Sequence, residues 1–231
     1  LAIAHRVAPV KGRYNAPMVH RPPLLPAKLV PPRPTRRVLR RPGLEARLRE
    51  ALDYRLTVLQ AGTGYGKTTA LTALASLGVP LCWYSLSEGD ADPQTFLAYL
   101  IAACAAGLPG LSDAAAVAHA EASGDGGGWT AALDALLGAL DTAIAGPTLL
   151  VLDDFHFIAG SAEARALTER LLAFAPPDLH VVIATRYPLP SAGSEADAQR
   201  LLARRRARGE VLELGGAALA FTPDETLALF R

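Results

Sequence analysis

The chain has 231 residues, of which 51% are apolar and 19% are charged, and its formal net charge is +1. This composition is typical of one globular domain with an appended segment, and it excludes both a disordered chain and a chain that attracts a polyanion through its overall field. The longest apolar run, Leu97 to Ala106, is too short to cross a bilayer, so no membrane partner is expected. Cys82 and Cys104 lie in apolar sequence, which favours free thiols and a cytoplasmic location.

The amino-terminal part is expected to lie outside the main core. Residues 1–25 are interpreted as a disordered or mis-started segment, because the chain begins with Leu1 and its only methionine is Met18. From Arg21 to Pro34 the density of prolines excludes a central strand or a regular helix and predicts an extended segment. We assign residues 26–43 to this arm and residues 44–231 to the folded domain.

The folded part alternates apolar strands with helices. Strands are predicted at Arg55–Ala61, Val79–Ser87, Thr148–Phe155 and Leu179–Arg186, and helices at Leu44–Leu52, Thr68–Leu77, Ala131–Ile144 and Ser161–Ala175. A further helix begins after Asp92, which is suited to an N-cap, with Pro93 in the first turn. Continuous apolar strands separated by helices predict a parallel sheet that is covered by helices on both faces.

A glycine-rich loop joins the first strand to the next helix, in the stretch "QAGTGYGKTT". Backbone N–H groups of such a loop surround phosphate oxygens at a helix amino terminus. The residues expected to bind the phosphates of ATP or ADP are Gly62, Thr63, Gly64, Tyr65, Gly66, Lys67, Thr68 and Thr69. Lys67 would reach the β- and γ-phosphates, and Thr68 would bind Mg²⁺. The first glycine of the motif is replaced by Ala61, which is tolerable where φ is negative.

Two acidic residues follow the third strand. Asp153 is expected to bind Mg²⁺ directly or through a water, and Asp154 to orient or deprotonate an attacking water. The alternative is an acidic loop without a cation, which the glycine loop disfavours. Arg186, at the end of the fourth strand beside Thr185, is expected to contact the γ-phosphate, with a surface charge as its alternative. Together these motifs predict an α/β P-loop NTPase.

Seven blocks, in order, resemble one family. They are "AKLVPPRP", "RRPGLEARL", "LTVLQAGTGYGKTT", "WYSLSEGDADPQTFLAYLIAA", "LLVLDDFHFI", "LHVVIATRYPLP" and "RARGEVLELGGAALAFTPDE". The chain from residue 26 onward is similar to the nucleotide-binding part of MalT-like regulators. These are ATP-binding transcriptional activators of the LuxR group, within the signal-transduction ATPases with numerous domains.

The resemblance implies a slow, Mg²⁺-dependent ATPase that acts as a switch. ADP would hold an inactive monomer, and ATP with an inducer would favour a self-associating active form. Val38 and either Arg40 or Arg41, in the arm, resemble the segment that covers adenine. Such regulators contact DNA through a carboxyl-terminal domain that is absent from this chain, which would make this sequence a fragment. The inserted stretch between Pro190 and Leu201 is expected to be an exposed loop.

Two other classes remain open at this stage. A metabolic phosphotransferase would need a lid and an acceptor pocket, for which the sequence offers no motif. A ring-forming ATPase would need an arginine supplied by a neighbour, and "RRRARG" contains candidates. The arginine clusters 33–41 and 200–208 also raise the possibility of phosphate-backbone contacts. Since they lack interleaved aromatic residues, a solvated or nucleotide-facing position is favoured for them.

Overall fold

The computed structural model describes residues 24–33, 38–111, 128–189, 202 and 204–229. Within them, five parallel strands form one sheet in the order β2-β3-β4-β1-β5. The strands are β1 (Leu56–Gln60), β2 (Leu81–Ser85), β3 (Thr148–Asp153), β4 (Leu179–Thr185) and β5 (Val211–Gly215). All four expected strands are present. The local pattern did not predict β5, an edge strand whose buried and exposed residues alternate.

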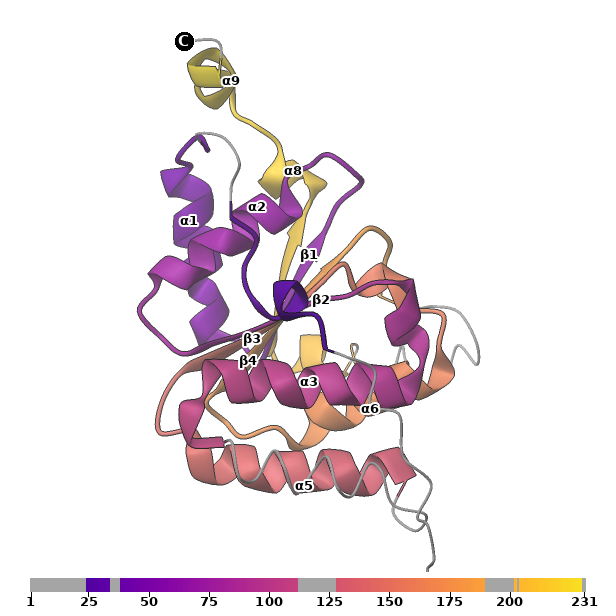
Figure 1. Ribbon diagram of the computed structural model, residues 1–231. Coiled ribbons are helices and arrows are strands. Elements are labelled where there is room, and N and C mark those ends of the chain that lie inside the picture. Colours follow the sequence, from indigo (N-terminus) through magenta and orange to yellow (C-terminus); the bar gives the residue numbers. More distant parts are fainter. Residues whose placement is uncertain (1–23, 34–37, 112–127, 190–201, 203, 230–231) are drawn as a thin grey trace, which may run out of the picture.

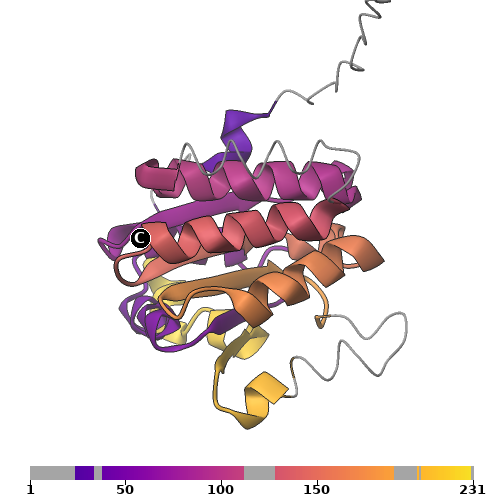
Figure 2. The ribbon, with the colours of Figure 1, turned by 90° about the horizontal axis from the view of Figure 1, so that it is seen from below.

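Helices cover both faces of the sheet, as the sequence predicts (Figure 1). One face carries α1 (Pro42–Arg49) and α2 (Lys67–Thr72), and the other carries α3 (Pro93–Gly107), α5 (Gly128–Ala143) and α6 (Ala162–Phe174). Figure 2 shows α3, α5 and α6 lying side by side as one layer. The fold is therefore that of an α/β P-loop NTPase, and the predicted fold class is confirmed.

Alternation along the strands divides the core into two clusters. In β1, Val58 packs toward the α3, α5 and α6 layer, whereas its neighbour Leu59 packs toward α1 and α2. In β3, Leu150 and Val151 divide between the two sides in the same way. Because both faces are covered, every residue of β3 and β4 is buried, which explains why these strands read as continuous apolar runs.

Several element boundaries differ from the predictions. The helix predicted at Leu44–Leu52 begins at Pro42 and ends as a single 3-10 turn, η2 (Glu50–Asp53). The helix predicted at Thr68–Leu77 divides into α2 and η3 (Ala73–Ser76). Side-chain hydroxyls of Thr72 and Ser76 donate to carbonyls three residues earlier, at 2.7 Å in each case, and this back-bonding accompanies the tighter turns.

The remaining described elements are short. They are η1 (Pro26–Leu29), η4 (Glu88–Ala91), η5 (Pro109–Leu111), η6 (Phe155–Phe157), α8 (Gly216–Leu219) and α9 (Pro223–Leu229). The predicted N-cap of α3 is confirmed, because the Asp92 carboxylate accepts a hydrogen bond of 2.8 Å from the Thr95 N–H. None of the helices in the described ranges is long and apolar enough to span a membrane.

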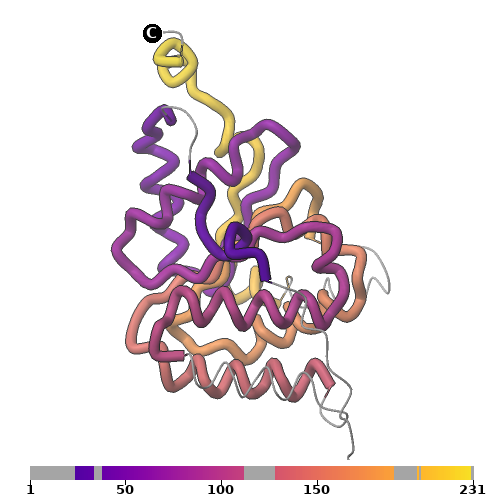
Figure 3. The backbone as a smooth tube through the Cα atoms, in the orientation of Figure 1, coloured from indigo at the N-terminus to yellow at the C-terminus, as the bar shows by residue number. Residues whose placement is uncertain are grey.

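The amino-terminal arm docks against β2 and α3 through one turn of helix, η1. The sequence excludes a regular helix here, and the structure contains a single 3-10 turn, in which Pro26 occupies the first turn and so loses no hydrogen bond. Lys28 Nζ contacts Ser87 Oγ at 2.7 Å and Asp90 Oδ2 at 2.5 Å, and the Leu25 N–H donates to the Tyr99 hydroxyl at 3.0 Å. These contacts tie the arm to the domain. The backbone tube in Figure 3 shows the turn of the arm lying against the domain.

Some predictions concern residues outside the described ranges. These are nearly all of the segment 1–25 and the inserted loop between Pro190 and Leu201. The boundary between arm and domain at residues 43 and 44 remains a prediction, because α1 spans it.

Candidate nucleotide-binding site

The glycine loop leaves β1 and enters α2, the context that the sequence predicts. Gly64 and Gly66 have φ values of 84° and 73°, which an L side chain rarely adopts, so these two glycines give the loop its shape. Among the residues that the structure describes, Asp154 is the only non-glycine with positive φ. Ala61 therefore meets the condition for replacing the first glycine, and it packs in the core below the loop.

Lys67 lies beneath the loop. Its side chain is largely buried and Nζ donates to the carbonyl oxygens of Ala61, at 2.7 Å, and Gly62, at 3.0 Å. Burial lowers the pKa of Lys67, Asp154 and Asp153 raise it, and Arg186 lowers it. The structure thus brings together four residues that the sequence predicts for one site, from the start of α2 and the carboxyl ends of β3 and β4.

Asp153 ends β3 with its side chain buried. Burial raises the pKa of its carboxyl group to about 6, against the opposing effects of a hydrogen bond from Thr68, the Asp154 N–H and Lys67. The Thr68 hydroxyl and the Asp153 carboxylate are therefore adjacent, and both are oxygen ligands of the kind that Mg²⁺ prefers. A buried carboxylate with a raised pKa also gains from a bound cation, so these residues fit the metal that the motif implies.

Asp154 has an unusual backbone. Its φ and ψ are 57° and 38°, in the left-handed region, where aspartate and asparagine are tolerated better than most residues. This conformation turns the chain at the end of β3, and about a third of the Asp154 side chain remains exposed. Strained backbone of this kind is often found where a side chain is aimed into a functional site.

Thr185 and Arg186 owe their position to the strand order. Because β4 lies between β1 and β3, its carboxyl end falls between the glycine loop and the acidic pair. The Thr185 hydroxyl is satisfied locally by the carbonyl of Tyr187 at 2.9 Å. The Arg186 guanidinium lies 5.9 Å from the ring centroid of Phe157 and is half-buried. Its charge lowers the pKa of both Lys67 and His156, which places it near the loop and the acidic pair.

His156 belongs to this cluster and was missed by the sequence analysis. Its side chain is 7% exposed, and Nδ1 lies 3.7 Å from Asp154 Oδ1. Neither ring nitrogen has a hydrogen-bond partner among the described residues. Burial lowers its pKa, Asp154 raises it, and Arg186 and Lys67 lower it. A single histidine after two aspartates carries no spacing signal, so only the fold reveals its location.

A cavity of about 730 Å³ borders the loop. Its walls include the predicted residues Val38, Arg41, Thr63, Gly64, Tyr65, Gly66 and Thr69. Leu44 and Leu48 of α1 provide an apolar wall. The volume is that of an ordinary small-molecule site. The arm residues and the phosphate loop thus border one continuous space, although they are separated by more than twenty residues in sequence.

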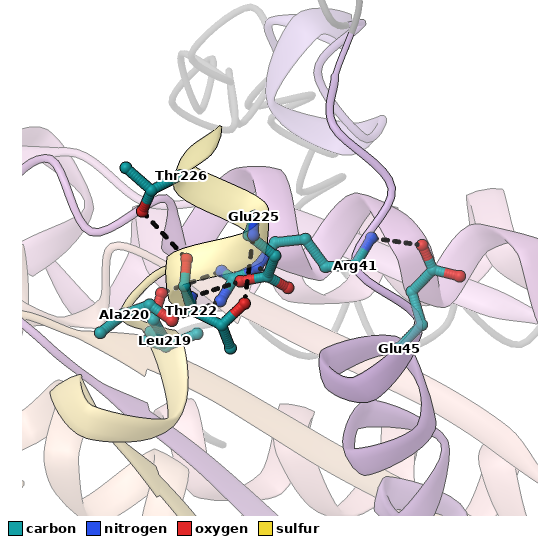
Figure 4. A network of polar contacts seen from close by, with 7 residues as sticks. All are labelled: Arg41, Glu45, Leu219, Ala220, Thr222, Glu225 and Thr226. Carbon is teal, nitrogen blue, oxygen red and sulfur yellow. Dashed lines mark hydrogen bonds and ion pairs between the residues drawn. The ribbon is translucent and has the colours of Figure 1, made fainter. Parts of the chain in front are cut away.

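The carboxyl-terminal segment, residues 216–229, forms another wall of this cavity. Leu219, Ala220 and Phe221 line it, which the sequence did not predict. The Tyr65 ring also faces this segment, because a Cβ built on Gly216 would lie 3.4 Å from it. Arg41 crosses from the start of α1 to the carbonyls of Leu219, at 2.9 Å, and Ala220, at 2.7 Å (Figure 4).

In the described part of the second arginine cluster, Arg204, Arg206 and Arg208 are exposed, as expected, but Arg205 is not. Arg205 is buried, and it pairs with Glu210 at 2.8 Å and donates to the carbonyl of Leu172. The expectation of a solvated or nucleotide-facing position is therefore wrong for Arg205. Arg206 is exposed but pairs with Glu213 at 2.5 Å. These contacts fasten the segment before β5 to the domain.

The fold and the loop define this chain as a P-loop nucleotide-binding domain. Its sequence is 33% identical over 210 residues to the HTH-type transcriptional regulator MalT of Cronobacter sakazakii, and 34% identical over 214 residues to that of Yersinia pestis strain Pestoides F. Each match covers 90% of this chain and 22% of the relative. The resemblance to MalT regulators is confirmed, and the chain spans about a fifth of the length of these relatives.

Other comparisons add little. No family model matches the chain. A chain from a structure of Drosophila ORC bound to AT-rich DNA and Cdc6 covers 80% of this chain and 59% of its own length, with 8% identity and a TM-score of 0.45. This likeness is too distant to bear on function.

Proposed function

We propose that this chain is the ATP-binding switch domain of a MalT-like regulator, which hydrolyses ATP slowly and differs in activity between its ADP and ATP forms. The observation that carries the proposal is the convergence of Lys67, Asp153, Asp154 and Arg186 at the carboxyl edge of the sheet. The similarity to MalT regulators supports a regulatory use of this site over a metabolic one.

In this proposal the phosphates lie on the loop. Lys67, now held by two loop carbonyls, would transfer its hydrogen bonds to the β- and γ-phosphates. Thr68 and Asp153 would hold Mg²⁺, which when bound neutralises charge on the phosphates. Val38 and Arg41 border the cavity that the base and ribose would occupy. In this arrangement Lys67, Thr68 and Asp153 would hold the phosphate end of the nucleotide, and Val38 and Arg41 the base and ribose end.

Hydrolysis requires a water in line with the γ-phosphate. Asp154, partly exposed beside Lys67 and Arg186, is suited to orient this water and to accept its proton. Arg186 would contact the γ-phosphate from β4, where charge changes as the phosphate leaves. The products would be ADP and phosphate. Slow turnover would then let the two nucleotide states persist as signals.

The first test is the identity of the bound nucleotide. The purified protein is denatured, the released nucleotide is identified by chromatography, and its exchange in fresh protein is timed. Retained ADP with slow exchange supports the switch. An empty site with rapid turnover favours a stand-alone ATPase or phosphotransferase instead. Self-association with ATP, and DNA binding through a separate carboxyl-terminal domain, are the further properties that the MalT similarity leads us to propose.

A second test separates binding from hydrolysis. Lys67→Ala is expected to abolish nucleotide retention, as measured by calorimetry with ATP and ADP. Asp154→Asn tests hydrolysis more cleanly than Asp154→Ala, because asparagine tolerates the left-handed backbone and the substitution removes only the charge. It should bind ATP and hydrolyse it at least about tenfold more slowly, or about 1.4 kcal/mol in barrier. Unchanged single-turnover hydrolysis would remove Asp154 from the mechanism.

A further inference from the structure

The start of α1 and the start of α9 are joined across the mouth of the cavity by one ion pair. Arg41 Nε donates to Glu225 Oε1 at 3.1 Å, and the two side chains are only 13% and 17% exposed. The Arg41 guanidinium also lies 4.7 Å from the ring centroid of Phe221. Three of its five N–H groups are thus bound to the carboxyl-terminal segment (Figure 4).

Glu225 is itself held in place by its own helix. Its Oε2 accepts from the Thr222 N–H at 2.9 Å, and its own N–H donates to Thr222 Oγ1 at 3.2 Å. This is a capping box, which fixes the carboxylate at the first turn of α9. One oxygen therefore caps the helix while the other receives Arg41. Contacts at the start of α9 therefore hold the carboxylate in position without a ligand.

Helix α9 lies at the surface of the described structure. None of its residues is buried. Arg41 at the start of α1 is likewise held by Glu45, whose Oε1 accepts from the Arg41 N–H at 3.2 Å. The Arg41–Glu225 pair therefore links α1 to α9, in addition to the hydrogen bonds by which Arg41 holds the Leu219 and Ala220 carbonyls. A ligand that fills the cavity and this pair that closes it would stabilise the same arrangement.

We propose that Glu225 is a positioning residue for nucleotide retention, acting through Arg41 to keep the arm and the carboxyl-terminal segment closed over the base and ribose. This inference rests on the proposed function. If the closed position of α9 strengthens nucleotide binding, then by linkage bound nucleotide must stabilise the closed position of α9 by the same free energy. The phosphate end, which Lys67 would hold, would not depend on Glu225, because Lys67 does not line this cavity.

The test measures how fast tritiated ADP leaves the protein after a chase with unlabelled ADP. Glu225→Gln keeps a side chain that can complete the capping box but removes the charge that Arg41 contacts. Release should become about tenfold faster, as expected for a charged hydrogen bond. Asp224→Asn is the matched control, since it removes the same charge from an exposed neighbouring position. Its release rate should equal that of the unmodified protein.

Two further measurements separate positioning from a general loss of stability. In an Arg41→Ala background, Glu225→Gln should cause no additional acceleration, because its effect passes through Arg41. Binding of tripolyphosphate, which has no base or ribose, should be the same with and without Glu225→Gln. An equal acceleration in both backgrounds, or a release rate like that of Asp224→Asn, overturns the inference while leaving the proposed function intact. Failure of the unmodified protein to hold ADP overturns both.

Discussion

Nδ1 of His156 lies 3.7 Å from Oδ1 of Asp154, and the imidazole contacts the rings of Phe157 and Tyr187. The distance is too long for a direct hydrogen bond, and it can be bridged by a small movement or a water. Since burial lowers its pKa, the imidazole is neutral near pH 7 and can donate one hydrogen bond to the carboxylate.

From this geometry we predict that His156→Ala slows single-turnover ATP hydrolysis about tenfold while the ADP affinity stays within about twofold. His156→Asn should recover part of the rate, because its amide can still donate toward Asp154. Calorimetry measures the affinity, and rapid quenching measures the hydrolysis. A parallel loss of affinity and rate in both variants would instead indicate that His156 only maintains the local structure.

The ion pair between Lys28 and Asp90 anchors the arm, and its loss should lower the stability of the protein considerably. In Lys28→Met, the Asp90 carboxylate loses its cation while remaining fully buried, so the free energy of unfolding should fall by about 3 kcal/mol. Arg206→Met is the control, because Arg206 and Glu213 are both about half exposed and their pair should contribute less than about 1 kcal/mol. Urea titration of both variants checks the difference, and similar midpoints would contradict the anchor.

Replacing either of two glycines by alanine should change the stability of the protein in opposite directions. A Cβ on Gly107 would lie 2.6 Å from Leu81 O and 2.8 Å from Cys82 N, both backbone atoms that cannot easily move. Gly107→Ala should therefore lower the free energy of unfolding by about 2 kcal/mol or more. Gly138, exposed in α5, has no atom within 4 Å of a built Cβ. Gly138→Ala should stabilise the protein by up to about 1 kcal/mol. Thermal unfolding distinguishes the two.

The parts of this structure that the sequence predicts are those with local signals. Strands β1 to β4 are continuous apolar runs because both faces are covered, and the glycine loop is recognisable because its backbone requires glycine at Gly64 and Gly66. Asp153 and Asp154 follow directly from their place at the end of β3. Each of these features depends on neighbours in the sequence.

The missed features depend on distant packing. Leu219 and Phe221 line the cavity only because β5 adds to the edge of the sheet and brings them to the arm. Arg41 and Glu225 are 184 residues apart, and neither has a local pattern that indicates its partner. Arg205 looks like a solvated charge until the fold places Glu210 and the Leu172 carbonyl beside it. Tertiary contacts of this kind leave no periodic trace in the sequence.

The ion pair between Arg41 and Glu225 also predicts that the rate of ADP release depends on pH. Its hydrogen bond from Arg41, followed by that from the Thr222 N–H, lowers the pKa of Glu225 below the ordinary value of 4.5. A depressed carboxyl pKa contributes stability that is complete above the ordinary value and is lost as the pH falls through the lowered one. ADP release should therefore accelerate below about pH 4.5 in the unmodified protein. In Glu225→Gln this component should be missing, because no carboxyl group titrates there. The measurement is the ratio of the two release rates from neutral pH to about pH 4, which cancels the titration of groups common to both proteins. A ratio that stays constant across this range would show that Glu225 does not control release.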